Sequence, residues 1–266
     1  MKKSCRVFKN SKDLSAATVA NHYVDMTDNR NPEGPGEPPG RWGGYATTFF
    51  EVDSLVTQPE LANLLSGLSA DGKKQLVPGR TRERVFGFEI SFHAPLDVSN
   101  LFAVGSPQLR AIVSACQEQA VRETLWILQQ NIKSTEPGAN GNHFVHGNIV
   151  YASFSHCTIN NRDPDLHSHV VIPNIAASDS GKICELNVNE MLKWSETLQP
   201  LFRNSLQCIL AQRLQVEAYQ PVLSTGQLNR CLNSLLNKKR RSVTSCIRAI
   251  PSSVSTANLA RALQFR

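Results

Sequence analysis

The chain has 266 residues, 41% of them hydrophobic, which is enough for one large domain or two small ones, and its formal net charge is +6. No stretch approaches the roughly 20 apolar residues of a membrane helix, and Met1-Lys2-Lys3 runs into polar residues, so we expect neither a membrane segment nor a signal peptide. Seven cysteines without a CxxC pair fit a reduced compartment, so we expect a soluble, cytoplasmic protein. The modest positive charge suits a polyanionic partner.

The N-terminal part predicts a helix followed by a long loop. Residues 12–27 carry Leu14, Val19 and Tyr23 at loosely helical spacing, with Ser11 or Asp13 as the candidate cap. Residues 29–44 contain five glycines and four prolines, which neither continue a helix nor fit inside a sheet. We therefore place Tyr23 on a helix that precedes a flexible connection, and we expect another short helix over 57–69.

The middle of the chain predicts a strand and then a long helix. Residues 85–95 alternate phenylalanine and isoleucine with other residues, which is the period of a strand. One face of that strand presents Glu89, Ser91 and His93 together. From about 107 to 132 apolar residues recur every three or four positions, which indicates a long amphipathic helix.

Two apolar runs, 143–156 and 167–177, flank an Asn/Asp/Pro-rich connection and predict an antiparallel hairpin. Residues 187–216 have a helical pattern, and periodicity fades from about 221. We therefore predict one domain over 1–220 and a basic, weakly ordered extension over 221–266.

Three histidines of the hairpin predict a metal site. His167 and His169 are two residues apart at the start of a strand, so their side chains lie on one face about 7 Å apart. His156 ends the preceding strand, and ten intervening residues allow a turn that brings it alongside the pair. Three imidazoles around one point form a site with open coordination positions, as catalytic metals have. The His-x-His pair alone is common without a metal, and the third histidine strengthens the interpretation.

These residues carry a family resemblance. FSHCTINNRDPDLHSHVVIPN (154–174) resembles the three-histidine motif of TrwC/TraI-type (MobF) conjugative relaxases, within the histidine-triad (HUH) endonuclease superfamily, including the histidine spacing, the Asp-Pro dipeptide and Asn174. Residues 87–105 are similar to the family's "LDLTFSAPKSVSLL" strand, and residues 40–44 to its "EWxGKGA" segment. The following helix (117–130) and a helical region (186–215) also resemble the family, so the resemblance covers roughly 5–216.

The resemblance implies a fold, a reaction and partners. The fold is α+β, a two-layer palm with a central antiparallel sheet and helices on one face. The reaction is a metal-dependent nick of single-stranded origin-of-transfer DNA, in which a tyrosine forms a covalent 5′-phosphotyrosine during plasmid mobilisation. The implied cofactor is a divalent ion, Mg²⁺ or Mn²⁺ with Zn²⁺ as the other candidate. The implied partners are single-stranded DNA or an origin hairpin, and other relaxosome proteins.

The resemblance also implies catalytic residues. Tyr23 is the candidate nucleophile, although the family shows a Tyr-Tyr pair where this chain has His22-Tyr23. Glu89 stands where the family has an aspartate that orients a metal histidine and accepts the nucleophile's proton. The missing pair leaves two alternatives open. In the first, Tyr23 only packs or stacks on DNA. In the second, the chain binds DNA without cutting it. A rolling-circle replication initiator is a third alternative, but its tyrosine typically follows the histidines.

Several residues are candidates for DNA contact. Trp42 lies in the Gly/Pro-rich connection and either stacks on a base or anchors the core. Candidate phosphate contacts are Arg162, Lys238, Lys239, Arg240 and Arg241, and the last four also fit a solvated charge cluster. In contrast, Leu96 and Asp97 replace a Lys-Ser of the family and remove a positive charge. The remaining histidines, at 93, 143 and 146, match no ligand of the family and are expected at the surface or in support of the ligands.

Overall fold

The computed structural model describes residues 5–11, 14–27, 37–77, 84–136, 143–158 and 164–216. These residues fall into two compact units. The first unit comprises the chain up to Ser91 together with 128–155 and 169–195. The second comprises 92–127, 156–168 and the chain from Glu196 onward. Each unit is described separately below.

Five strands form the main sheet, in the order β1 (Cys5–Lys9), β3 (Val85–His93), β7 (Pro164–Pro173), β6 (Tyr151–Thr158) and β2 (Arg41–Gly43). β1 pairs with β3 and β2 pairs with β6, both antiparallel, and the register places Arg6 opposite Glu89. The predicted hairpin is confirmed for β6 and β7, which are neighbours in the sheet. The predicted strand 143–156 is instead divided at Val150, and residues 143–149 and 176–177 pair in the small barrel described below. The α+β class with an antiparallel sheet is confirmed.

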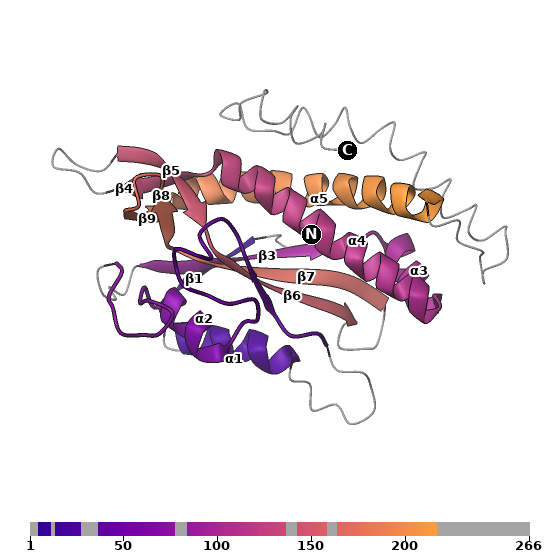
Figure 1. The fold of residues 1–266 in the computed structure, drawn as a ribbon, viewed down its shortest axis with the longest axis horizontal. Coiled ribbons are helices and arrows are strands. Elements are labelled where there is room, and N and C mark those ends of the chain that lie inside the picture. The colour runs from indigo at the N-terminus through magenta and orange to yellow at the C-terminus, as the bar shows by residue number, and fades with distance from the viewer. Residues whose placement is uncertain are drawn as a thin grey trace. The chain divides into compact units, whose positions relative to one another are not determined.

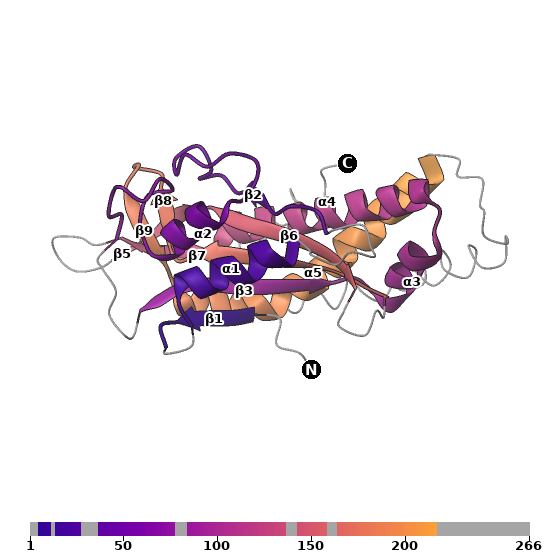
Figure 2. The same ribbon diagram turned by 90° about the horizontal axis from the view of Figure 1, so that it is seen from below.

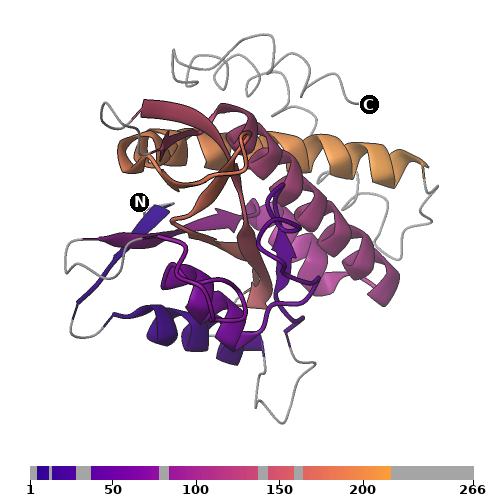
Figure 3. The same cartoon turned by 60° about the vertical axis from the view of Figure 1, so that its left-hand side comes forward.

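In the first unit, helices α1 (Ala16–Thr27) and α2 (Gln58–Leu65) lie side by side against one face of the strands (Figures 1 and 3). Local hydrogen bonds set where each helix begins. Ser15 and Thr18 bond each other's backbone N–H groups at 3.2 and 2.7 Å, so α1 begins at Ala16 and Ser11 is not its cap. Asp13, the other candidate cap, lies outside the described residues. Thr57 and Glu60 form a capping box at the start of α2, a reciprocal pair that satisfies two free backbone donors.

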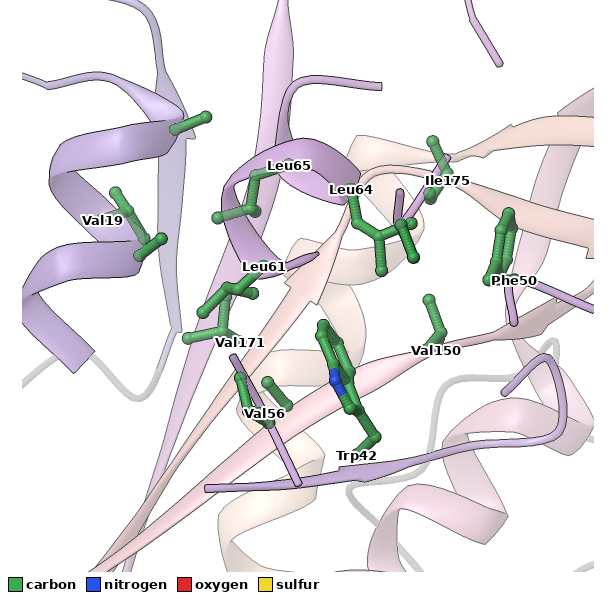
Figure 4. Packing of buried hydrophobic residues seen from close by; sticks show 14 of the residues in the cluster. Val19, Trp42, Phe50, Val56, Leu61, Leu64, Leu65, Val150, Val171 and Ile175 are labelled. Atoms are coloured by element: carbon green, nitrogen blue, oxygen red, sulfur yellow. The ribbon is translucent and has the colours of Figure 1, made fainter. Parts of the chain in front are cut away.

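The core of the first unit fills the space between these helices and the sheet. Figure 4 shows leucines of α2 meeting Trp42, Val150, Val171 and Ile175. The Trp42 side chain is 8% exposed, and its indole N–H donates to a carboxylate oxygen of Glu60 at 3.4 Å. Trp42 therefore anchors the core, and in this arrangement neither face of the ring is open to a stacked base.

A small barrel of four short strands belongs to the same unit: β4 (Lys133–Glu136), β5 (His143–Ile149), β8 (Ala176–Ser178) and β9 (Ile183–Leu186). Figure 2 shows β5, β8 and β9 grouped beyond the ends of the longer strands. Asn174 joins this barrel to the sheet, since its side chain donates to the carbonyl of Val85 and accepts from the N–H of Leu186, both at 2.9 Å. The role of Asn174 is thus to fix the backbone.

The second unit contains α3 (Leu96–Val104), most of α4 (Pro107–Asn131), the part of α5 (Val188–Val216) from residue 196, and the ends of β3, β6 and β7. Ser205 of α5 donates a hydrogen bond to Glu123 of α4, and Phe202 packs on Phe92 with ring centroids 5.2 Å apart. The two long helices predicted from the sequence are confirmed. The helix α3 was not predicted, and the expected 57–69 helix is shorter, because the chain turns at Gly67 with φ of 78°. The proposed extension over 221–266 lies outside the described residues.

Candidate active site

Tyr23 lies on the buried face of α1. Its side chain is 2% exposed, and Ala16, Val19 and Ala20 on the same face are also buried, so small residues bring the helix close to the sheet. The phenol ring stacks on Phe154 of β6 at a centroid distance of 5.5 Å. The ring of His169 is 5.6 Å away, and His22 meets the edge of Tyr23 at 5.0 Å. The N-terminal helix therefore brings Tyr23 into contact with one of the predicted metal ligands.

Glu89 of β3 links Tyr23 to His169. One carboxylate oxygen is 2.6 Å from Nδ1 of His169 and 2.9 Å from the hydroxyl of Ser91, which donates to it, and Tyr23 also hydrogen-bonds the carboxylate. Burial alone would raise the pKa of this carboxyl, but the hydrogen bond and charge of His169, together with Tyr23 and Ser91, lower it to about 2. Glu89 is thus an ionised, buried carboxylate, which excludes a solvated strand position.

The contact between Tyr23 and Glu89 lowers the pKa of Glu89 but raises that of Tyr23. Burial raises the pKa of the phenol, and the negative charge and hydrogen bond of Glu89 raise it further, while Arg6 lowers it slightly. Tyr23 is therefore protonated at neutral pH, with its hydroxyl donating to Glu89. Arg6 is the nearby cation, placed by its register opposite Glu89 on β1.

In the second unit, His156 of β6 and His167 of β7 lie together, with ring centroids 5.4 Å apart. Both are almost fully buried, at 3% and 5% exposure. Nδ1 of His167 is 2.7 Å from the backbone carbonyl of Asp165, which requires a proton on Nδ1 and leaves Nε2 as the lone-pair donor. His169 follows two residues along β7, and its Nδ1 is engaged by Glu89 in the same way.

Two further groups lie against His167. The His93 ring stacks on it at 5.1 Å with an interplanar angle of 11°, and Nδ1 of His93 is 3.2 Å from the Asp165 carboxylate. The sequence placed His93 on the face of Glu89 and Ser91 and expected it at the surface or in support of the ligands, whereas Asp165 was not singled out. The two-residue period of β7 could have found Asp165, which lies two residues before His167.

Buried polar side chains of α3 and α4 form hydrogen bonds with β7, the strand that carries His167 and His169. The amide of Gln117 on α4 donates to the Ser168 hydroxyl at 3.2 Å, between the two histidines of β7. Ser99 of α3 accepts from the backbone N–H of Leu166 at 3.1 Å. Such contacts fix the backbone from which the histidines project. Neither residue was identified from the sequence.

The other predicted DNA contacts lie outside the described residues. They are Arg162, Lys238, Lys239, Arg240 and Arg241. His146 and His143 belong to the small barrel, where His146 pairs with Asp179 at 3.3 Å. Among the described helices, none is long and apolar enough to cross a bilayer.

The family model described as TrwC relaxase matches residues 15–230, which is most of the chain. The chain belongs to the TrwC relaxase family. It is 29% identical over 168 residues to the multifunctional conjugation protein TraI of Escherichia coli, and 28% identical over the same length to TraI of Escherichia coli strain K12. The alignment covers 60% of this chain and 9% of each TraI protein, so the chain spans a small part of these relatives.

Solved structures show the same fold. A metal-free conjugative relaxase TrwC in complex with oriT DNA aligns with a TM-score of 0.63 at 20% identity, covering 97% of this chain and 88% of that one. A metal-bound TrwC complex with oriT DNA aligns with a TM-score of 0.64 at 17% identity, covering 91% and 97%. At these identities the likeness establishes the fold alone.

Proposed function

We propose that this chain is a strand-nicking domain that cuts single-stranded origin-of-transfer DNA through a covalent 5′-phosphotyrosine on Tyr23. The observation that carries the proposal is the contact of Tyr23 with Glu89 and His169, which joins a candidate nucleophile, a proton acceptor and a candidate metal ligand. Family membership supports it, as do the TrwC structures described as complexes with oriT DNA.

The histidines fit a divalent ion. Nδ1 of His167 and of His169 each faces an oxygen, so in both rings Nε2 is the nitrogen proposed to bind a metal. Metal-ligating histidines are usually oriented in this way, by a carboxylate or carbonyl that accepts a hydrogen bond from the other ring nitrogen. His156, beside His167, is the third proposed ligand. An ion bound there would act as a Lewis acid on a phosphate oxygen; Mg²⁺ or Mn²⁺ is proposed, with Zn²⁺ as the other candidate.

The reaction is a transesterification. The Tyr23 oxygen forms a bond to phosphorus, the bond from phosphorus to the 3′ oxygen breaks, and the 3′ oxygen takes a proton from water, so that the DNA keeps a free 3′ hydroxyl. Because Tyr23 is protonated at neutral pH, its proton has to leave during attack, and ionised Glu89 is the acceptor already in hydrogen-bond contact. Stacking on Phe154 orients the phenol ring before attack.

Formation of a covalent adduct tests the proposal directly. Labelled single-stranded origin oligonucleotides are incubated with the protein and Mn²⁺ or Mg²⁺, and a protein–DNA band that survives denaturation is measured. We expect the wild type to form it and Tyr23→Phe to lose it while still binding DNA and metal. Tyr45→Phe is the matched control, because Tyr45 is the next tyrosine in the chain and is 49% exposed. An adduct that persists in Tyr23→Phe would overturn the assignment.

One observation favours a second candidate, a homologue that binds DNA without cutting it. The Tyr23 side chain is 2% exposed, and its hydroxyl is engaged by Glu89, so a phosphate reaches it only if α1 shifts. DNA binding by the wild type without any adduct would support this alternative.

The proposed partner is single-stranded DNA or an origin hairpin, with other relaxosome proteins in the cytoplasm as further partners. For the basic residues Arg162, Lys238, Lys239, Arg240 and Arg241 we propose phosphate contacts. Replacing the four residues of the Lys238–Arg241 run with alanine is expected to flatten the salt dependence of DNA binding, by a slope of about 0.7 per lost contact on a single strand. An unchanged slope would remove this run from the interface.

A further inference from the structure

Two side chains beside His167 have no part in the chemistry proposed above. They are His93 at the end of β3 and Asp165 near the start of β7. Nδ1 of His93 is 3.2 Å from one carboxylate oxygen of Asp165 and 3.3 Å from the other. One donor atom from each of His93, Asp165 and His167 lies within 4.8 Å of the other two, in the only such group found among the described residues.

We propose that His93, Asp165 and His167 form an alternative divalent-cation site, separate from the position that uses His156 and His169. Two imidazoles and one carboxylate are a donor set that suits Mn²⁺, Co²⁺ or Zn²⁺ better than Mg²⁺, which prefers oxygen donors and water. The site therefore selects a transition metal.

The distances fit ligands of one ion. Ligand atoms about 2.0 to 2.2 Å from a metal lie roughly 3.0 Å apart at right angles and roughly 3.5 Å apart at tetrahedral angles. The separations between His93 and Asp165 fall within this range. The third donor atom, on His167, lies within 4.8 Å of the other two and has to come closer for all three to bind one ion. The side chains of His93 and Asp165 are 26% and 20% exposed, so an ion from solvent can reach them.

The backbone around these residues is fixed. The Gln199 side chain of α5 accepts from the backbone N–H of His93 at 3.4 Å and donates to its carbonyl at 2.8 Å. Ala94 donates to the carbonyl of Leu166 at 2.9 Å, which ties the end of β3 to the segment that carries Asp165. A site on strand ends held in this way needs little reorganisation to bind an ion.

The two cation positions exclude one another. Since Nδ1 of His167 faces the carbonyl of Asp165, this ring has one lone pair, on Nε2, and serves one ion at a time. The chain therefore binds one ion through His167, in either position. This differs from a two-metal centre, in which both ions are present together.

A hydrogen-bonded His–Asp pair without a metal role is the competing explanation, and the chain contains a matched example. His146 and Asp179 lie 3.3 Å apart in the small barrel, where no third ligand group joins them among the described residues. If the competing explanation holds, His93 and His146 will respond alike to metal.

The test measures Co²⁺ binding by calorimetry and by the visible absorption of the bound ion, on protein freed of metal. His156→Ala/His169→Ala removes the first position and keeps His167. We expect this double variant to retain one Co²⁺ per chain. Adding His93→Ala or Asp165→Asn should weaken that binding at least tenfold, whereas adding His146→Ala should not change it. Excess Mg²⁺ should not displace the Co²⁺.

The inference is overturned if the double variant binds no Co²⁺, if adding His93→Ala has no more effect than adding His146→Ala, or if Mg²⁺ competes equally. Far-ultraviolet circular dichroism checks folding, and His93→Gln replaces His93→Ala if the alanine variant does not fold. Because no step measures nicking, failure here is distinguishable from failure of the proposed strand-nicking activity.

Discussion

Nδ1 of His169 lies 2.6 Å from the carboxylate of Glu89, and this contact relates two residues that are 80 positions apart in the chain. It fixes the orientation of the imidazole and places a negative charge beside its Nδ1 atom. The same carboxylate accepts a hydrogen bond from Tyr23, so one buried group bears on both the proposed ligand and the proposed nucleophile.

The first prediction concerns metal affinity. Glu89→Gln removes the charge behind His169 and Glu89→Ala removes the hydrogen bond as well, so we expect Mn²⁺ affinity to fall by about 10-fold and up to 100-fold respectively. Calorimetric titration of metal-free protein measures the change. Glu118→Gln is the control, because Glu118 is a partly exposed residue of α4 that pairs with Arg122 at 3.8 Å. Unchanged affinity in Glu89→Ala would show that His169 needs no such support.

The second prediction concerns acid stability. The pKa of Glu89 is about 2 in the folded protein against a usual 4.5, so its contribution is present above pH 4.5 and is lost as the pH falls toward 2. The contribution is at most about 3 kcal/mol. Urea unfolding in EDTA should show the stability of the wild type relative to Glu89→Gln shrinking between pH 6 and pH 3. A difference that stays constant over this range would contradict the lowered pKa.

Much of the site follows from strand periodicity. Alternation placed Glu89, Ser91 and His93 on one face of β3, and the two-residue spacing placed His167 and His169 on one face of β7. In the structure, Glu89 and Ser91 both meet His169, and His93 meets His167. A local pattern was sufficient for these residues because side-chain direction in a strand depends only on position.

Other features depend on contacts that no local pattern encodes. Three strands of the small barrel, β4, β8 and β9, are only three or four residues long, too short for a periodic signal, and they exist because they pair with neighbouring strands. Trp42 follows a glycine-rich segment typical of an exposed loop, yet it is buried because α2 and β6 supply apolar surface around it. Asp165 faces His93 only because β3 and β7 are neighbours.

The third prediction concerns Gly44, directly after β2. Its φ is 106°, and a Cβ there would lie 2.2 Å from the carbonyl oxygen of Ile149. We expect Gly44→Ala to lower the free energy of unfolding by about 3 kcal/mol or more, since backbone strain and a clash with fixed backbone act together. Gly181→Ala is the matched control, with φ of 76° and open space around the added methyl group.

Gly181→Ala should cost only about 1 kcal/mol, the strain of a left-handed residue. Chemical denaturation of both variants gives the comparison. Equal losses would mean that the approach of Ile149 contributes nothing and that conformation alone demands the glycine.

The last prediction concerns the ionisation of Tyr23. Burial is the main cause of its raised pKa, and the negative charge of Glu89 adds to it, because a phenolate beside a carboxylate is repelled. Neutralising Glu89 removes that repulsion and leaves the burial, so Glu89→Gln should lower the pKa of Tyr23 without returning it to the value of a free tyrosine. Tyrosinate absorbance in EDTA, titrated upward from neutral pH, measures it. Tyr23→Phe in each background identifies the contribution of Tyr23 among the four tyrosines. We expect Tyr23 of the wild type to remain un-ionised until the protein unfolds in alkali, and Tyr23 of Glu89→Gln to ionise at lower pH. If the two titrations coincide, Glu89 does not control the protonation of Tyr23, and its role as the proton acceptor fails with it.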